Sequence, residues 1–273
     1  MSYAALLVHC DRVQGCADRV RLASDLAARF DAALIGSAGW SFQPSFALDD
    51  TTGTGDLRER DWQLDRLAEI EKTFHASVQR LELAHVEWRG AVDSPSELVP
   101  REARAADLVI IGPQRDPSDL FFSLNPGAMI LRAGRPVLFV PDAIDLLQGR
   151  RIVVCWKNTR EARRAIADAL PFLREADHVT IASVSEIGTE EQIRNEIEHV
   201  TTYLLSHEVN VSAKAYLHTE QSIAAELLRF SKEQEADLIV TGGYGHSRLG
   251  EWVFGGVTNG LLADSAVSCL FSH

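Results

Sequence analysis

The chain has only four cysteines among its 273 residues, and none of them belongs to a CxxC pair. Cys10, Cys16, Cys155 and Cys269 are dispersed, which favours reduced and mostly buried thiols over a disulfide framework. The nine histidines show no ligand spacing either. We therefore expect a protein of the cytoplasm without a metal site.

Long apolar runs and basic stretches are also missing. No segment approaches the eighteen or more apolar residues of a membrane span, and the apolar run in "MSYAALLVHCD" is too short for a signal peptide. The formal net charge of -12 argues against a nucleic-acid-binding surface, because phosphate backbones select basic stripes. We expect a soluble protein that binds neither membranes nor nucleic acids.

The common catalytic motifs are absent as well. The sequence contains no G-x-S-x-G elbow, and no Cys–His pairing can be read from the order of its residues. Neither the Walker loop nor the dinucleotide fingerprint occurs. Acidic pairs such as Glu190-Glu191 fit a helix start better than a catalytic carboxylate pair. We do not expect a turnover enzyme.

What the chain does contain is a pattern written twice. "ADLVIIGP" begins at Ala106 and "ADLIVTGG" at Ala236, 130 positions later, whereas "LLVHCD" and "IVVCWK" near the start of each half are 146 positions apart. The 16 extra residues of the first half fall in Gly39–Arg60, which we expect to form a long exposed loop. Two domains of one kind are predicted, residues 1–142 and 150–273.

Each half alternates apolar runs with segments of helical periodicity. "SPSE" adds a capping box at Ser94, with Pro95 at the first helical position. The apolar positions that predict helices are Leu67, Phe74, Val78 and Leu81 in the first half, and Ala162, Ala165, Ile166, Ala169 and Leu173, then Ile193, Ile197, Val200 and Leu204, in the second. This order predicts βαβ units, hence a parallel sheet with helices on both faces and a ligand site beyond the carboxyl ends of the strands.

The stretch "DLIVTGGYGHSRLGEWVFGGVTNGLL" (Asp237–Leu262) places three glycines after a strand and two more before a helix. Glycine lets the backbone approach a ligand closely, and the free N–H groups at a helix start favour an anion. On glycines alone, phosphate binding competes with a tight turn and close helix packing. His246 follows the first cluster, where it could reach a phosphate or simply face water.

The spacing Gly242-x2-Gly245-x9-Gly255 resembles the G-x2-G-x9-G-(S/T) motif of ATP-binding universal stress proteins. "WKNTREARRAIADALPFL" is similar to the first strand–helix junction of tandem bacterial members, and the ending "CLFSH" fits their last strand. The resemblance implies two flavodoxin-like domains, each a five-stranded parallel sheet of order 3-2-1-4-5, that pair across their last strands. It also implies that the phosphates and ribose are surrounded by Gly242, Gly245, Gly255, Val257 and Thr258.

Departures from the family pattern qualify this expectation. Gly256 stands where the motif has Ser or Thr, which removes a hydroxyl donor. Lys157 stands where nucleotide-binding members end their first strand with an acidic residue, and it could pair with a phosphate or fill the base pocket. In the first half, Asp11 is retained, but only Gly112 of the glycine set remains, and the prolines that follow offer no N–H groups. We expect this half to have lost its nucleotide site and to serve as a built-in dimer partner.

The favoured hypothesis is a tandem universal stress protein with a regulatory or protective role, whose second domain binds ATP or a related adenine nucleotide, with or without Mg²⁺. The alternative is a nucleotide-free interaction scaffold in which both sites are lost. A third hypothesis is an ATP-hydrolysing or redox enzyme on the same fold. The last strands, "PVLFVP" and "SCLFSH", are expected to pair with each other or with those of a second copy in a homodimer.

Overall fold

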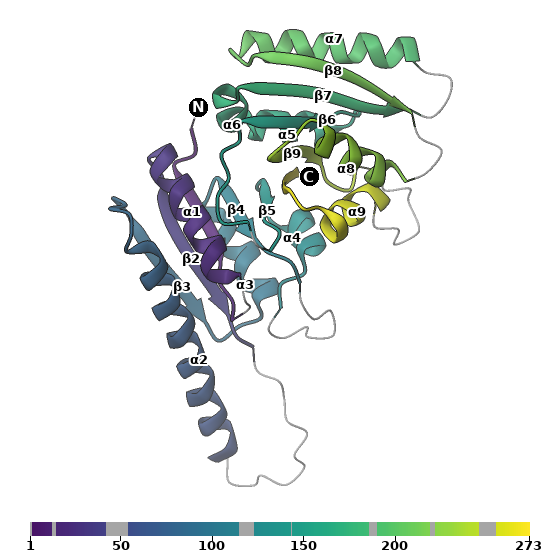
Figure 1. Ribbon diagram of the computed structural model, residues 1–273. Helices are drawn as coiled ribbons and strands as arrows, with labels where there is room; N and C mark the ends of the chain where they lie inside the picture. Colours follow the sequence, from purple (N-terminus) through teal and green to yellow (C-terminus); the bar gives the residue numbers. More distant parts are fainter. Residues whose placement is uncertain are drawn as a thin grey trace. The chain divides into compact units, whose positions relative to one another are not determined.

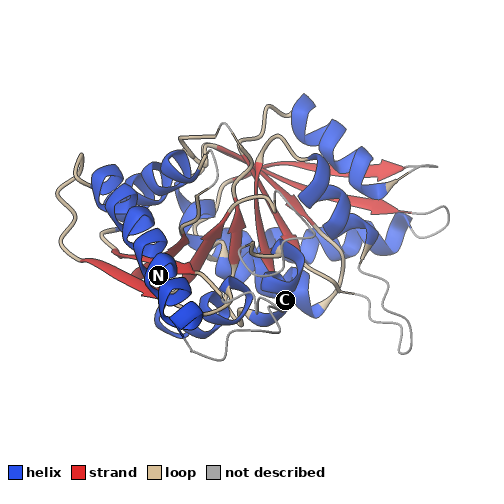
Figure 2. Ribbon diagram, turned by 90° about the horizontal axis from the view of Figure 1, so that it is seen from below, coloured by secondary structure: helices blue, strands red, loops and turns tan. Residues whose placement is uncertain are grey.

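The computed structural model describes residues 2–12, 15–41, 54–114, 123–142, 144–185, 190–218, 222–245 and 255–273. The chain divides into two compact units, Tyr3–Gly134 and Arg135–His273. Strands and helices alternate along the chain, and helices lie on both faces of a mainly parallel sheet in each unit (Figures 1 and 2). The predicted α/β class is confirmed.

The first unit has four parallel strands in the order β3-β2-β1-β4. In chain order its elements are β1 (Ala5–His9), α1 (Cys16–Phe30), β2 (Ala33–Gly39), α2 (Thr54–Val78), β3 (Val86–Ala91), α3 (Pro95–Glu102), a 3-10 turn (Ala103–Ala105), β4 (Leu108–Ile111) and α4 (Pro126–Arg132). Helices α1 and α2 pack against each other, as do α3 and α4. The carboxyl ends of the neighbouring parallel strands β1 and β4 meet at one edge of the sheet.

The second unit has strands in the order β8-β7-β6-β9-β10-β5, and only β5 is antiparallel to its neighbour β10. Its elements are β5 (Val137–Phe139), β6 (Arg151–Cys155), α5 (Arg160–Asp168), α6 (Leu170–Glu175), β7 (His178–Ser185), α7 (Glu190–Ser206), β8 (Val211–His218), α8 (Ile223–Glu233), β9 (Leu238–Gly242), α9 (Gly256–Asp264) and β10 (Ser268–Ser272). Here β6 and β9 are the central strands, and their carboxyl ends carry the segments singled out in the sequence.

Most helices follow the predicted periodicity. Leu67, Phe74 and Val78 of α2 are buried, as are Ile197 and Leu204 of α7. One expectation is wrong: the apolar positions between Ala162 and Leu173 do not form a single helix. Helix α5 ends before Ala169 and α6 begins after it. Pro171 has no N–H to donate one turn back, which interrupts the hydrogen bonding of α5, and α6 begins at Leu170.

Two local predictions in the first unit need correction. The expected loop Gly39–Arg60 is shorter, because α2 begins at Thr54; residues 42–53 lie outside the described part of the chain. Helix α3 does begin after Ser94 with Pro95, but the Ser94 side chain makes no cap hydrogen bond. The Glu97 carboxylate, which a capping box would turn back to Ser94, instead pairs with the Arg132 guanidinium at 2.6 Å.

The last strand of the first sequence half belongs to the second unit. Val137, Leu138 and Phe139 of β5 pair antiparallel with Phe271, Leu270 and Cys269 of β10, in that order. All six residues are buried. Of the two pairings considered from the sequence, the chain adopts the internal one.

Candidate functional site

The first glycine after β9 is occupied by a neighbouring helix. A Cβ on Gly242 would lie 2.6 Å from the backbone N of Ala162 and 2.8 Å from the carbonyl carbon of Glu161. Contacts this short require a residue without a side chain, so Gly242 lets the start of α5 pack against the end of β9. The space beside Gly242 is filled by the chain itself.

Gly245 faces a carboxylate. A Cβ there would lie 3.0 Å from Glu161 Oε2 and 3.2 Å from Thr159 Oγ1. Burial of Glu161 would raise its pKa, but hydrogen bonds from its own backbone N–H and from Thr159 and Arg160 hold the pKa below its usual value. A negative charge therefore stands at the described end of the first glycine cluster.

The two glycine clusters are joined through Tyr244 and the first turn of α9. Tyr244 has a positive φ of 55°, and its backbone N–H donates to Thr258 Oγ1 at 3.1 Å. Its phenol donates to Asn259 Oδ1 at 3.2 Å. Thr258 is buried, so its hydroxyl oxygen, predicted to face a phosphate, already accepts a hydrogen bond within the chain.

The second cluster is open. A Cβ on Gly255 would only reach ordinary contact distance of Tyr244, at 3.8 Å, and one on Gly256 would meet nothing within 4 Å. Gly256 begins α9, and Val257 in the same turn is half-buried. His246 and the residues up to 254 lie outside the described part of the chain.

Lys157 follows β6 as an exposed side chain. Its carbonyl accepts from the Thr159 N–H at 2.7 Å, which fixes the turn into α5. Among the described residues, no carboxylate lies within ion-pair distance of the Lys157 ammonium. Within that part of the chain, the ammonium therefore places an unshared positive charge just beyond the carboxyl end of β6.

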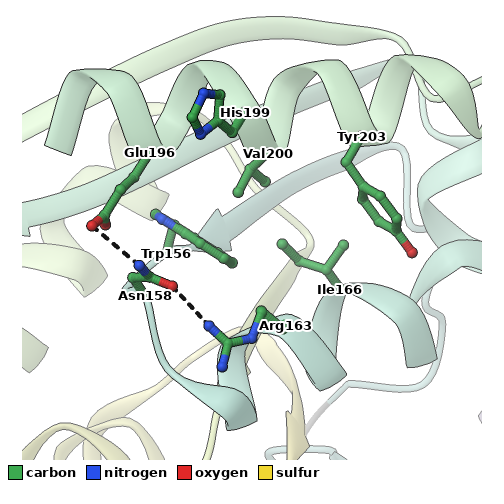
Figure 3. A pocket seen from close by; sticks show the side chains of 8 residues that line it. All are labelled: Trp156, Asn158, Arg163, Ile166, Glu196, His199, Val200 and Tyr203. Carbon is green, nitrogen blue, oxygen red and sulfur yellow. Dashed lines mark hydrogen bonds between the residues drawn. The ribbon is translucent and has the colours of Figure 1, made fainter. Parts of the chain in front are cut away.

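A pocket of about 390 Å³ lies between α5 and α7, beside this turn (Figure 3). That volume is in the range of small-molecule sites. One wall is apolar and the other polar. Its lining residues are Trp156, Asn158, Arg163, Ile166, Glu196, His199, Val200 and Tyr203.

The polar wall is a chain of hydrogen bonds across the two helices. Arg163 Nη1 donates to Asn158 Oδ1 at 2.8 Å, and Asn158 Nδ2 donates to Glu196 Oε1 at 3.2 Å (Figure 3). The Trp156 ring is buried, and its Nε1 has no hydrogen-bond partner among the described residues. Buried N–H groups are normally satisfied by a protein group or an ordered water, so this one is an exception among the pocket residues.

The sequence reading missed this polar wall. Glu196, His199 and Tyr203 follow one another at intervals of three and four along α7, beside the apolar stripe used to predict the helix. Their positions relative to Asn158 were not readable, because the contact depends on the packing of α5 against α7.

The corresponding edge of the first unit is filled by a cation. Arg19 is buried; its Nη2 lies 2.8 Å from Asp11 Oδ2, and its Nε donates to the His9 carbonyl at 3.1 Å. A Cβ on Gly112 would lie 2.0 Å from Arg19 Nη1. The single glycine retained in the first half therefore makes room for a guanidinium of the chain itself.

Burial shapes the electrostatics of this cluster. It lowers the pKa of His9 to about 4, although Asp11 acts in the opposite direction.

Asn125, which precedes Pro126, caps α4 by accepting from the Ala128 N–H at 2.8 Å. Within the described ranges, no three metal-binding side chains come together, and none of the helices has the length and apolar character of a membrane span.

Comparison with known proteins gives a family match for part of the chain. The model of the universal stress protein family matches residues 149–273, which include the whole run from β6 to β10. Residues 149–273, just under half of the chain, therefore match a universal stress protein domain. The chain matches none of the curated proteins with which it was compared.

Solved structures extend the likeness in fold to the full chain. A universal stress protein from Archaeoglobus fulgidus DSM 4304 superposes with a TM-score of 0.68 at 12% identity, covering 98% of this chain and 97% of that one. A protein of unknown function from Pseudomonas aeruginosa PAO1 has a TM-score of 0.58 at 14% identity, with 99% and 92% covered. At these identities the likeness shows the fold alone.

Proposed function

We propose that this chain is a tandem universal stress protein of the cytoplasm with a regulatory or protective role, and that residues 150–273 bind ATP or a related adenine nucleotide. Residues 1–142 form the domain that has lost its site. The observation that carries the proposal is a contrast between the two units. In the second unit, Lys157 and Gly256 are exposed, and a Cβ on Gly256 would meet nothing within 4 Å. In the first unit, the Arg19 guanidinium occupies the equivalent edge of the sheet.

The residues fit a nucleotide with the phosphates toward the second glycine cluster. The N–H groups at the start of α9, around Gly255 and Gly256, suit an anion, and the Lys157 ammonium adds a positive charge. The Glu161 carboxylate against Gly245 repels phosphate, so Gly245 lies beside the ribose rather than the phosphates in this proposal. The Trp156 indole beside Lys157 is a candidate wall for the base.

The proposal is of a binding protein rather than an enzyme. When bound, the nucleotide would supply charge and shape that a partner can recognise, and Mg²⁺ would accompany it as a counter-ion of the phosphates. Lys157 occupies the position from which an acidic side chain would hold a catalytic metal in this site.

Thermal unfolding of the full chain with millimolar ATP tests the proposal. Binding to the folded state raises the melting temperature by mass action. Lys157→Met should reduce the shift, because it removes the unshared ammonium. Lys232→Met is the matched control, since this exposed lysine lies in the last turn of α8, before the start of β9, and should keep the full shift.

Gly245→Val should abolish the shift, because the branched side chain fills the approach to the ligand and pushes on Glu161. A wild-type chain whose melting temperature does not move with ATP would contradict the proposal. Equal shifts in Lys157→Met and wild type would contradict the role given to the ammonium.

The nucleotide-free scaffold is favoured by one observation, the ionised Glu161 carboxylate standing against Gly245. In that version both units present surfaces to partners, and the glycines serve helix packing. Mass spectrometry of the chain as purified separates the two: a co-purified adenine nucleotide supports binding, whereas none together with no thermal shift supports the scaffold.

A further inference from the structure

The pocket between α5 and α7 contains a buried donor without a partner. Trp156 is 7% exposed, and its Nε1 has no hydrogen-bond partner among the described residues. In Figure 3 its ring lies between Glu196 and Asn158 on one side and Ile166 on the other. An unpaired buried N–H costs free energy, so a small molecule that brings an acceptor into the pocket would remove that cost.

The polar side of the pocket carries one cation and one anion that are held apart. Asn158 Oδ1 accepts from Arg163 Nη1 at 2.8 Å, and Asn158 Nδ2 donates to Glu196 Oε1 at 3.2 Å, so the amide stands between the two charges. A guanidinium has several N–H donors, and a carboxylate accepts several hydrogen bonds. Arg163 therefore suits a ligand carboxylate, and Glu196 suits a ligand ammonium.

The other side of the pocket is apolar. Ile166 of α5 and Val200 of α7 are buried there, whereas Tyr203, which also lines the pocket, is 41% exposed. A ligand can therefore reach two aliphatic side chains from solvent. The volume of about 390 Å³ is near the lower end for small-molecule sites, which suits a molecule of few atoms better than a whole nucleoside triphosphate.

We propose that this pocket binds a free apolar α-amino acid such as leucine. The ligand ammonium lies against Glu196, and the ligand side chain lies against Ile166 and Val200. The two carboxylate oxygens are the only acceptors of the zwitterion, and they take the donors of Arg163 and Trp156.

This site goes beyond nucleotide binding and does not depend on it. Of the described residues given to the nucleotide, only Trp156 lines the pocket. Residues of α7 can therefore be changed to separate the two ligands.

Titration of the full chain with L-leucine, without nucleotide, tests the proposal. The readout is the indole N–H signal of Trp156 in a ¹H–¹⁵N spectrum, which Trp156→Phe identifies among the five tryptophans of the chain. We expect this signal to move as leucine saturates the site, and calorimetry to give the same dissociation constant. A Trp156 signal that stays in place at millimolar leucine overturns the proposal.

Three analogues test the ligand chemistry on the wild-type chain. 4-Methylpentanoate lacks the ammonium, 3-methylbutylamine lacks the carboxylate, and glycine lacks the apolar side chain. Each should bind about tenfold more weakly than leucine, because a charged hydrogen bond or a buried apolar side chain contributes on that order. An analogue that binds as tightly as leucine overturns the part of the assignment that it lacks.

Variants on the two helices assign the ends of the ligand. Arg163→Met should weaken leucine about tenfold but leave 3-methylbutylamine unchanged, whereas Glu196→Gln should weaken leucine but leave 4-methylpentanoate unchanged. Arg164→Met and Glu198→Gln are the matched controls, because these charged residues lie on the same helices but form their ion pairs outside the pocket lining. Leucine binding at full strength in both Arg163→Met and Glu196→Gln overturns the proposal.

The same Glu196→Gln chain should keep its thermal shift with ATP if the nucleotide binds at the glycine loops. A loss of amino-acid binding is thereby distinguished from a loss of nucleotide binding. Where a variant fails to fold, the analogue series on the wild type still decides the proposal.

Discussion

In the first unit, the carboxyl end of β1 faces a buried guanidinium, whereas in the second unit the equivalent turn after β6 leaves an ammonium in solvent. Gly112 makes room for Arg19, and Gly242 makes room for the start of α5. The same sequence repeat therefore uses its strand-four glycine for two different internal contacts. The comparison shows that a glycine after such a strand can be required by close packing within the chain. A ligand site must therefore be argued from glycines that have open space beside them.

The largest expected effect comes from removing the cation that closes the first unit. Arg19→Met leaves the partly buried Asp11 carboxylate and the His9 carbonyl without the Arg19 guanidinium, which should destabilise the first unit by about 3–5 kcal/mol. Hydrogen exchange measured by mass spectrometry should show faster exchange in β1 and β4 and unchanged exchange in β6 and β9. Arg19→Met with Asp11→Asn should recover part of the loss; equal losses would contradict the pair.

The second unit should be broken at Gly242. Gly242→Val places methyl groups into the backbone of Glu161 and Ala162, and should cost about 2–4 kcal/mol in the free energy of unfolding. Gly256→Ala is the matched control: it meets nothing within 4 Å and should be neutral or stabilising, because alanine favours the helix. Urea unfolding measures both, and equal losses would show that open space does not distinguish these glycines.

The pH should sharpen the comparison, because the buried neutral His9 belongs to the first unit. Its pKa falls from an unfolded value near 6.5 to about 4, so folding disfavours the protonated ring. The stability of the fold with neutral His9 is fully present above about pH 6.5. As the pH falls toward about 4, the free energy of unfolding should decrease by roughly 3 kcal/mol in total. Hydrogen exchange of each unit across this range checks it. His9→Asn should flatten the dependence in the first unit, and an unaltered dependence would contradict the assignment.

The smallest effect concerns the link between the glycine clusters. Thr258→Ala removes the oxygen that accepts from the Tyr244 N–H and should cost about 1 kcal/mol. Thr258→Ser keeps the acceptor and should recover most of that loss. Urea unfolding midpoints of the two variants provide the measurement; if serine behaves as alanine does, the hydroxyl contact is not the cause.

Apolar periodicity and the sequence repeat predicted the helices and strands. They could do so because the burial of one face of a helix or strand leaves a pattern among residues that are close in the sequence. The apolar stripe of α7 and the strands around Gly242 were readable for that reason. Long-range choices were not. Nothing local to Glu97 indicates that it pairs with Arg132, or that Arg19 reaches Gly112. The pocket beside Trp156 likewise arises from two helices whose packing no single segment encodes.

Strand β5 has a practical consequence for dissecting the chain. It completes the hydrogen bonding of β10 on the side opposite to β9, so an isolated fragment starting at Arg150 would carry β10 with bare main-chain donors and acceptors. Such a fragment should self-associate through β10, whereas one starting at Arg135 keeps β5 on that edge of β10. A strand from the first sequence half thus covers an edge of the sheet formed by the second half.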